Sequence, residues 1–202
     1  MSSSFARFLS IVLHPILMPS YILWFLFNQG TYFSAFVSPF EKAVLYVIVV
    51  VFTLIMPALF VNYLVVKGKI RSAEMESREE RRLPFTAYLI LLLTAYYLMI
   101  LLRLPALPVL MILGAAIATA FSLLINYFWK ISIHMVGIGG ALGLMFAVNS
   151  IIIIDLSMAI VLTTLVTGLL GTARLSLGAH DSWQVYAGFF TGFLSEFLLM
   201  TW

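Results

Sequence analysis

Seven long apolar segments, separated by short polar breaks, constrain the fold of this chain more than any other feature. They cover residues 8–28, 43–66, 85–102, 106–128, 135–152, 155–173 and 183–201. A helix needs about 20 mostly apolar residues to cross a bilayer, and each segment is close to that length. The segments are continuously apolar, which favours helices over barrel strands. We therefore expect an all-α, polytopic transmembrane helix bundle of about six to seven spans, with residues 1–202 forming a single domain.

Composition supports this expectation and limits the function classes. Of the 202 residues, 63% are hydrophobic and 9% charged, whereas about a quarter of a soluble domain is charged. The absence of cysteine excludes disulfides and thiolate metal sites. The net charge of +3 gives no reason to expect nucleic-acid binding, because the basic residues are confined to loops between the spans. No small-residue cleavage site follows the first segment, so we expect it to be a retained anchor.

The apolar stretch 135–173 is too long for one span, and Asn149, Ser150 and Asp155 mark the expected reversal inside it. Seven spans then bring the N-terminus and the connections 67–84, 129–134 and 174–182 to one side, which we call the polar face. It carries nine of the eleven basic residues, and only Lys42 and Arg103 lie opposite. The positive-inside rule favours the cytoplasm for this face. We expect an integral protein of a bacterial inner membrane.

Two of the three histidines lie in polar islands at the ends of spans on this face. Ser132 and His134 precede a glycine-rich run, in which Gly137, Gly139 and Gly140 favour close helix packing. Ser132 is expected to cap the helix that follows, whose free amides can bind an anion. In the second island Arg174 precedes His180, and Gly178 allows a turn that would bring both side chains to one pocket. Arginine suits phosphate oxygens, and imidazole can form a labile phosphoramidate.

The loop 67–84 supplies further candidate phosphate ligands. We expect it to be helical, with Glu74 and Arg78 paired at i,i+4 and with Arg78, Arg81 and Arg82 projecting to one side. Either Arg78 or Arg81 is expected to reach the phosphate, while Lys67 and Lys69 face lipid headgroups. The alternative is a solvated loop whose positive charge only anchors two spans. On the last span, Gln184, Gly188, Gly192 and Glu196 form one stripe, which we interpret as a packing face with Glu196 snorkelling or paired.

Together these residues resemble the type-2 phosphatidic acid phosphatase and vanadium haloperoxidase superfamily over roughly residues 60–195. That family carries Lys-x6-Arg-Pro, then Pro-Ser-Gly-His, then Ser-Arg-x5-His-x3-Asp. Ser132-Ile133-His134 matches the second motif, with Ile131 and Ile133 in place of proline and glycine. Arg174-x5-His180 matches the third motif, preceded by Ala173 instead of serine. For the first motif, Arg71-x6-Arg78 has the spacing, and Arg81 or Arg82 before Pro84 is the competing alignment.

The resemblance implies that His180 is the nucleophile and His134 the general acid, with Ser132 and Arg174 holding phosphate. It implies a reaction without metal or cofactor. Gln184 stands where the family has the aspartate that orients the nucleophile. Its amide oxygen can accept the Nδ1 proton of His180 but supplies no charge, and Asp181 could replace it only if the turn swings it inward.

These observations lead to a membrane-embedded lipid phosphatase as the expected function, with a phosphohistidine intermediate and a phospholipid or polyprenyl phosphate as substrate. A phosphatidic acid-like glycerolipid and a polyprenyl pyrophosphate are both compatible with the sequence, which does not determine the oligomeric state. The competing hypothesis is a catalytically silent protein that binds lipid phosphate or has a structural role, favoured by Gln184. A third is a transporter, which would need broken helices and ionisable groups near mid-bilayer. His14, next to Pro15 in the first span, is the feature that hints at it.

Overall fold

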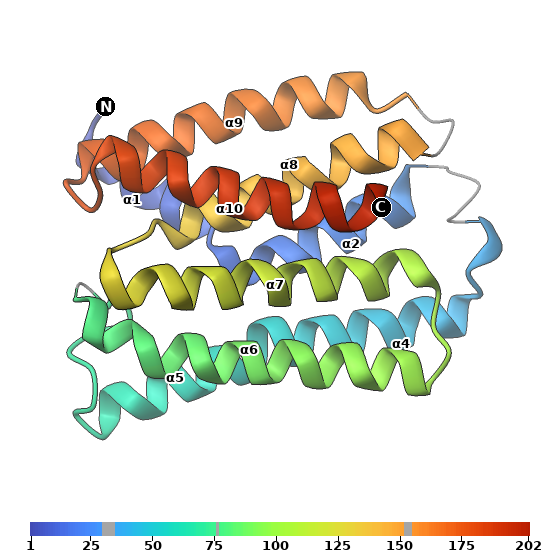
Figure 1. Ribbon diagram of the computed structural model, residues 1–202, viewed down its shortest axis with the longest axis horizontal. Coiled ribbons are helices and arrows are strands. Elements are labelled where there is room, and N and C mark those ends of the chain that lie inside the picture. The colour runs from blue at the N-terminus through green and yellow to red at the C-terminus, as the bar shows by residue number, and fades with distance from the viewer. Residues whose placement is uncertain (30–34, 76, 152–154) are drawn as a thin grey trace.

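The computed structural model describes residues 1–29, 35–75, 77–151 and 155–202, and this part of the chain is built of helices joined by short connections (Figure 1). Six helical segments are long and apolar enough to cross a membrane, so the expected polytopic all-α bundle is confirmed. The single helices among them are α6 (Arg78–Leu101), α7 (Ala106–Phe128), α8 (Ile133–Ile151) and α9 (Ser157–Ser176). The seventh expected span forms α10 (Ser182–Thr201), which lies against α8 and α7 and is not among the six.

The other two spans are interrupted helices. The first consists of α1 (Ser3–Val12), the short 3-10 turn η1 (Pro15–Leu17) and α2 (Met18–Asn28). Proline has no N–H to donate and fixes its own backbone, so Pro15 begins a new turn after the break at His14. The second consists of α4 (Pro39–Val49), the π-helical segment η2 (Val50–Ile55) and α5 (Met56–Val66). Pro57 lies in the first turn of α5, directly after the π-helical segment.

The expected reversal between the fifth and sixth spans is present. Asn149 Oδ1 accepts a hydrogen bond from the amide of Leu156 at 2.9 Å, and Asp155 Oδ1 accepts one from Ser157 at 2.9 Å. Residues 152–154, which include the last residue expected in the fifth span, lie outside the described chain.

The loop 67–84 differs from the expected helix. Only its second half is helical, because α6 begins at Arg78 behind a capping box formed by Ser77 and Glu80. Glu80 also interacts with Arg71 at 4.0 Å, whereas the expected Glu74–Arg78 pair is not among the ion pairs of the described residues. Gly68 and Met75 adopt left-handed backbone conformations, with φ of 64° and 47°. The loop therefore folds back over the end of the bundle; Glu76 is outside the described residues.

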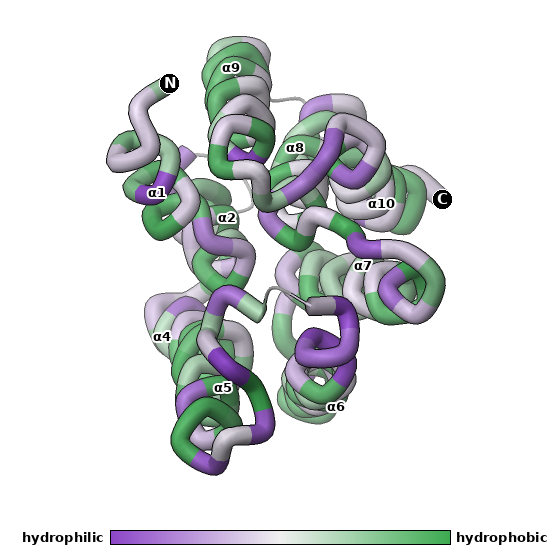
Figure 2. Tube along the Cα trace, turned by 90° about the vertical axis from the view of Figure 1, so that its left-hand side faces the viewer, coloured by the Kyte–Doolittle hydropathy of each residue, from purple (hydrophilic) through white to green (hydrophobic). Residues whose placement is uncertain are grey.

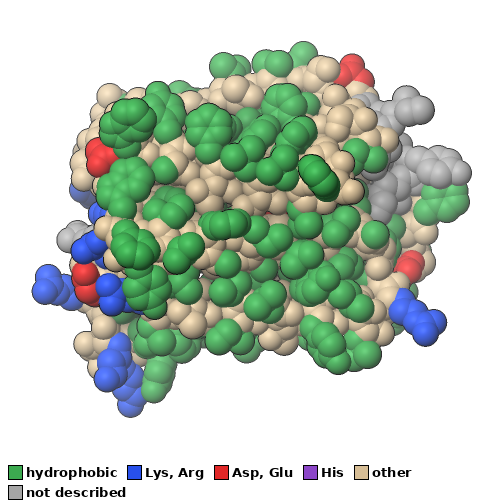
Figure 3. Space-filling model, viewed as in Figure 1, with side chains coloured by type: hydrophobic (Ala, Val, Ile, Leu, Met, Phe, Trp, Pro, Cys, Tyr) green, Lys and Arg blue, Asp and Glu red, His purple; other side chains and the backbone are tan. Residues whose placement is uncertain are grey.

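The three connections 67–84, 129–134 and 174–182 lie at one end of the bundle, together with the N-terminus (Figure 1). Seen from that end, the hydrophilic parts of the chain are the connections nearest the viewer (Figure 2). Most Lys and Arg side chains visible on the surface gather there as well (Figure 3). This end is the polar face expected from the sequence. It is where α6, α8 and α10 begin, as does α1 next to the N-terminus, and the N-termini of these helices point toward it.

Glycines bring α8 and α10 into backbone contact. A Cβ atom on Gly139 would overlap the carbonyl oxygen of Phe189, and one on Gly192 would overlap that of Val136. A Cβ atom on Gly188 would lie 2.5 Å from the carbonyl oxygen of Ser132. The role of the α8 glycines in close packing is thus confirmed. Of the α10 stripe, Gly188 and Gly192 pack as expected, whereas Gln184 contacts His180. Glu196 is a further exception, because it is buried and neither snorkels nor pairs.

We expect Gly192→Ala to destabilise the protein by roughly 1–3 kcal/mol, because the new methyl group has no space unless α8 and α10 separate. The measurement is the thermal unfolding midpoint in detergent. Gly168→Ala is the matched control, since a Cβ at this α9 position has nothing within 4 Å. Equal unfolding midpoints for the two variants would contradict the backbone contact.

Candidate functional site

Basic side chains tie the connections of the polar face to one another. Arg81 is 3% exposed, and its guanidinium donates from Nε to the carbonyl oxygen of Met75 at 2.8 Å and from Nη1 to that of Ile131 at 2.9 Å. Lys130 Nζ donates to the carbonyl oxygen of Ala179 at 3.0 Å. The loop before α6, the turn before α8 and the turn before α10 therefore converge. Around them lies a group that we call the polar cluster: Arg81, Ser132, His134, Arg174 and His180.

His180 is buried in the turn between α9 and α10. The turn closes because Gly178 adopts a φ of 62° and the amide of Ala179 donates back to the carbonyl oxygen of Arg174. His180 Nδ1 lies 2.7 Å from Gln184 Oε1. An amide oxygen only accepts, so Nδ1 carries the proton and Nε2 presents its lone pair. Nε2 is buried and has no hydrogen-bond partner in the described structure.

Asp181 does not orient His180. Its exposed carboxylate caps α10, accepting a hydrogen bond from the amide of Gln184 at 2.9 Å. Of the two candidates for the orienting role, Gln184 is thus the one in contact with the imidazole.

Burial lowers the pKa of His180 to about 4. The hydrogen bond to Gln184 opposes this shift in the pKa, whereas the positive charges of Arg81, Lys130 and Arg174 add to it. The imidazole is therefore neutral at physiological pH, the form in which its nitrogen can act as a nucleophile.

His134 is held by the break in the first span. In an unbroken helix the carbonyl oxygen of Ser10 would accept from the amide of His14, but that amide donates to Ile11 instead. The freed oxygen lies 3.0 Å from His134 Nε2, so Nε2 carries a proton and donates it. His134 Nδ1 is buried without a partner. His14 completes the arrangement, its ring edge-on to that of His134 with 5.2 Å between centroids.

Arg174 reaches the same residue of the first span. Its Nη1 donates to the hydroxyl of Ser10 at 3.0 Å, while its Nε is buried without a partner. Arg174 interacts electrostatically with both His134 and His180, and also with Arg81. Glu74, in the loop that folds over this end, is the acidic group that acts on Arg174. Positive charge therefore predominates in the cluster.

Ser132 lies immediately before α8, but its hydroxyl makes no capping hydrogen bond, contrary to expectation. The oxygen is fully buried and without a partner, and so it is available to a ligand. The amide of Ser132 donates to the carbonyl oxygen of Gln184 at 3.3 Å, which links the two histidine-containing turns. Because α8 and α10 both begin here, the positive ends of two helix dipoles add to the positive potential.

The remaining loop cations lie apart from the cluster. Arg78 Nη1 donates to the carbonyl oxygen of Phe128 at 2.6 Å, and Nη2 lies 3.9 Å from Glu79. Arg82 lies over the ring of Tyr127, 4.8 Å from its centroid. Lys67 and Lys69 are exposed. Of the arginines expected to reach a phosphate from this loop, Arg81 is therefore the one in the cluster.

Sequence reasoning missed three polar residues at the site, namely Ser10, His14 and Lys130. Ser10 and His14 belong to a segment that reads as an anchor, and their contacts depend on where the helix breaks. Pro15 was a usable signal, since a proline inside an apolar span marks a backbone carbonyl that has lost its donor. Lys130 was counted only for its charge.

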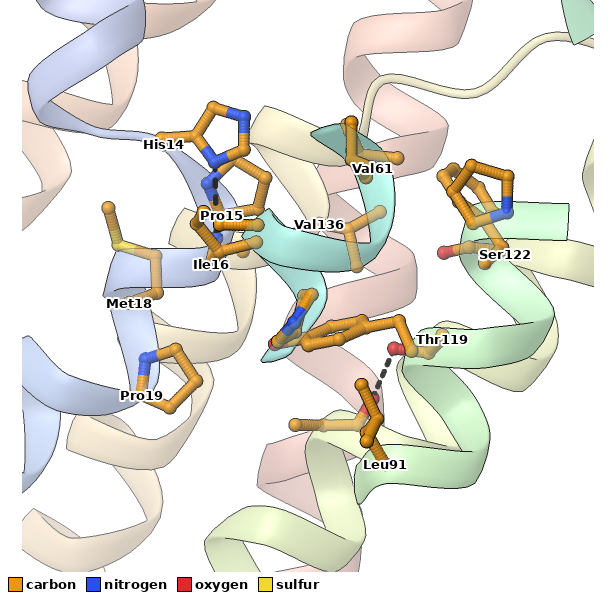
Figure 4. Close-up of a pocket in the computed structure, with 18 of the residues that line it drawn as sticks. His14, Pro15, Ile16, Met18, Pro19, Val61, Leu91, Thr119, Ser122 and Val136 are labelled. Carbon is orange, nitrogen blue, oxygen red and sulfur yellow. Dashed lines mark hydrogen bonds between the residues drawn. The ribbon is translucent and has the colours of Figure 1, made fainter. Parts of the chain in front are cut away.

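A cavity of about 590 Å³ lies in the bundle between α2, α5, α6, α7 and α8. Its lining includes His14, whose ring touches that of His134, and Ile133, but none of the five residues of the polar cluster. Figure 4 shows His14, Pro15 and Pro19 on one wall, with Thr119 and Ser122 on the opposite wall and Val136 between them. The end of the cavity nearest the polar face, which we call its mouth, is lined by His14, Ile133 and the loop residues Arg71–Ala73 and Met75. The rest of the wall is mostly apolar but includes Glu196. The size of the cavity is typical of ligand cavities. Among the described residues no three His, Asp or Glu side chains lie together as a metal site would need.

We expect His180 to titrate with a midpoint near pH 4, well below an ordinary histidine near 6.5, because burial and the three cations disfavour the imidazolium. In Gln184→Glu, which keeps the side-chain length and adds a negative charge, the midpoint should rise. The measurement is an NMR titration of histidine-labelled protein in detergent, with the signal assigned by its loss in His180→Ala. A wild-type midpoint near 6.5 would contradict the buried environment.

Comparisons with known proteins gave no match: no family model, no characterised protein and no solved structure resembles this chain at the level searched. The resemblance to the phosphatase superfamily therefore depends on the motifs in the chain itself, and the activity it implies stays a prediction. The geometry of the polar cluster is independent of that resemblance.

Proposed function

We propose that the protein is a membrane-embedded lipid phosphatase of a bacterial inner membrane that works through a phosphohistidine intermediate. One observation carries the proposal: four groups of the cluster each have a buried polar atom that finds no hydrogen-bond partner among the residues that the structure describes. These atoms are Ser132 Oγ, His134 Nδ1, Arg174 Nε and His180 Nε2. Buried polar atoms in proteins are nearly always paired, so four unpaired ones in a positively charged group favour a site for an anionic ligand.

For His180, the proposed reaction uses the protonation that its contacts favour. His180 Nε2 attacks phosphorus while its Nδ1 proton stays with Gln184 Oε1, and the bond between phosphorus and the lipid oxygen breaks. The leaving oxygen takes a proton from Nδ1 of His134. The ring must bind this second proton before the step, since its Nε2 proton stays bound to the carbonyl oxygen of Ser10, and the negative phosphate in the site supplies the charge that favours the doubly protonated form. Water then attacks the phosphohistidine, releasing phosphate and restoring His180. Arg174, Ser132 and Arg81 hold the phosphate oxygens.

The cavity supports a lipid as the substrate. Its mouth is lined by His14 and Ile133, the immediate neighbours of His134 in the cluster. Its mostly apolar deeper wall suits an acyl or prenyl chain, so one molecule could reach from the cluster into the cavity. A phospholipid and a polyprenyl phosphate both have this division into a charged head and an apolar chain.

A catalytically silent lipid-phosphate-binding protein is the second candidate, favoured by Gln184. A neutral amide orients His180 but does not stabilise the imidazolium, and loss of the corresponding charge in related relays costs orders of magnitude in rate. A transporter gains support from the broken first span and from buried Glu196. It does not explain why four polar atoms of the cluster are unpaired.

We expect the purified protein to release phosphate from lipid phosphates in detergent without added metal. The turnover rate of His180→Ala should be lower by about a thousandfold or more, because the nucleophile is removed. Gln184→Asp, which restores the family residue, and Gln184→Glu, which keeps the 2.7 Å contact, should each raise turnover. Turnover is measured over a panel containing phosphatidic acid and a polyprenyl pyrophosphate, and acid-labile phosphohistidine is sought after quenching. If neither wild type nor either Gln184 variant releases phosphate, catalysis is ruled out and the binding protein remains.

We expect Arg81→Ala to weaken the binding of vanadate, a phosphate mimic, by about tenfold or more, because a charge-assisted contact is lost. Lys67→Ala is the matched control and should change binding little, since Lys67 lies over Tyr63, 5.9 Å from its ring centroid. Arg81→Lys distinguishes the effect of the charge on binding from the effect of the guanidinium on the fold, because it keeps the positive charge but loses the two hydrogen bonds to carbonyl oxygens. Binding is measured by titration calorimetry in detergent. Equal effects of Arg81→Ala and Lys67→Ala would favour a loop that only anchors the spans.

A further inference from the structure

Glu196 places a carboxyl group in the wall of the cavity, within the apolar part of the bundle. The residue is 4% exposed, and its Oε2 has no hydrogen-bond partner in the described structure. It projects from α10 toward two positions that lack side chains. A Cβ atom on Gly114 of α7 would overlap the carboxyl group, and one on Gly140 of α8 would lie 3.5 Å from Cγ of Glu196. The space that the carboxyl group occupies therefore depends on glycines in two neighbouring helices.

A carboxyl group in this position is costly to retain. Away from water, an unpaired polar group loses its hydration without compensation, and ionisable residues within spans therefore tend to mark ligand or ion sites. The basic residues lining the cavity are His14 and Arg71, which belong to its mouth. Thr119 and Ser122 also line the cavity, but their hydroxyls already donate to carbonyl oxygens of their own helix, those of Ala115 and Ala118. None of these groups pairs with Glu196.

We propose that Glu196 binds a hydroxyl or amine carried on the chain of a phosphorylated lipid, an inference that rests on the proposed function. The depth follows from α8. Ile133 lines the mouth beside Ser132, and Gly140, next to Glu196, lies about two turns or 10 Å further along the helix. The donor should therefore lie about 10 Å from phosphorus. This favours lipids with a polar group on the chain over plain polyprenyl phosphates, which have no donor there.

Three synthetic lipids test the depth and the chemistry. They are hexadecyl phosphate, its derivative with a hydroxyl at carbon 8 and its derivative with a hydroxyl at carbon 15. We expect wild type to prefer the 8-hydroxy lipid by about tenfold in kcat/KM for phosphate release, as one hydrogen bond made away from water allows. Glu196→Leu should abolish this preference and leave turnover of hexadecyl phosphate unchanged, which also shows that the variant folds. Thr119→Val, which also lies in the cavity wall, is the matched control and should keep the preference.

The amine is distinguished from the hydroxyl by Glu196→Gln. The amide oxygen still accepts a hydrogen bond, so part of the 8-hydroxy preference should persist. A preference for 8-aminohexadecyl phosphate should be lost, because a carboxyl group can give its proton to the amine and form an ion pair with it, whereas an amide cannot. Phosphate release without any preference in wild type, or a preference that survives in Glu196→Leu, would overturn the Glu196 site.

A second measurement separates this inference from the phosphatase itself. Hexadecan-8-ol, which carries no phosphate, should raise the unfolding temperature of wild type more than hexadecane does, and Glu196→Leu should remove the difference. A Glu196-dependent shift in a protein that releases no phosphate would refute the phosphatase and support the site. Phosphate release with equal shifts for both compounds in wild type and Glu196→Leu would refute the site and leave the phosphatase.

Discussion

The backbone contact between α8 and α10 is the interaction on which the polar cluster depends. The two helices run in parallel from the polar face, and their glycines let them approach until the amide of Ser132 reaches the carbonyl oxygen of Gln184. That contact fixes the turn bearing His134 next to the turn bearing His180. It also sets two helix N-termini side by side, so that their partial positive charges reinforce each other. A wider spacing between these helices would move the two histidines apart and weaken the positive potential that the two helix N-termini produce together.

The fold could be predicted from sequence because the bilayer leaves few choices: apolar segments of the right length become helices, and alternating connections must return to the same face. Counting the spans was enough to predict that Ser132, His134, Arg174 and His180 lie at the same end of the bundle. The effect of the helix break at His14 could not be predicted. The break frees the carbonyl oxygen of Ser10, but which group binds that oxygen depends on the residue that packs beside it, here His134. The expectation that Glu196 snorkels or is paired was wrong. The sequence shows how far along the last span Glu196 lies, but it does not show that glycines of α7 and α8 face it and leave room for a buried carboxyl group.

Gln184 fits the electrostatics of this cluster in a way that its sequence position alone does not reveal. Arg81, Lys130 and Arg174 all act on His180, so the imidazole is kept neutral by its neighbours as well as by burial. A neutral partner that fixes the proton on Nδ1 is sufficient to leave the Nε2 lone pair available. An anionic phosphate arriving in this group would be the counter-charge that the cluster otherwise lacks, apart from Glu74 at its edge.

The contacts of Ser10 have a consequence for the biosynthesis of the protein. Its hydroxyl accepts from Arg174 and its carbonyl oxygen faces His134, so the polar cluster joins the first span to the connection before α10. During synthesis the first span enters the membrane long before that connection has been made. The cluster therefore cannot assemble on a partly inserted chain, and its buried polar atoms come together only when the helices near both ends of the described chain have met. A complete site therefore forms only in a protein whose helices have all been inserted in the correct topology.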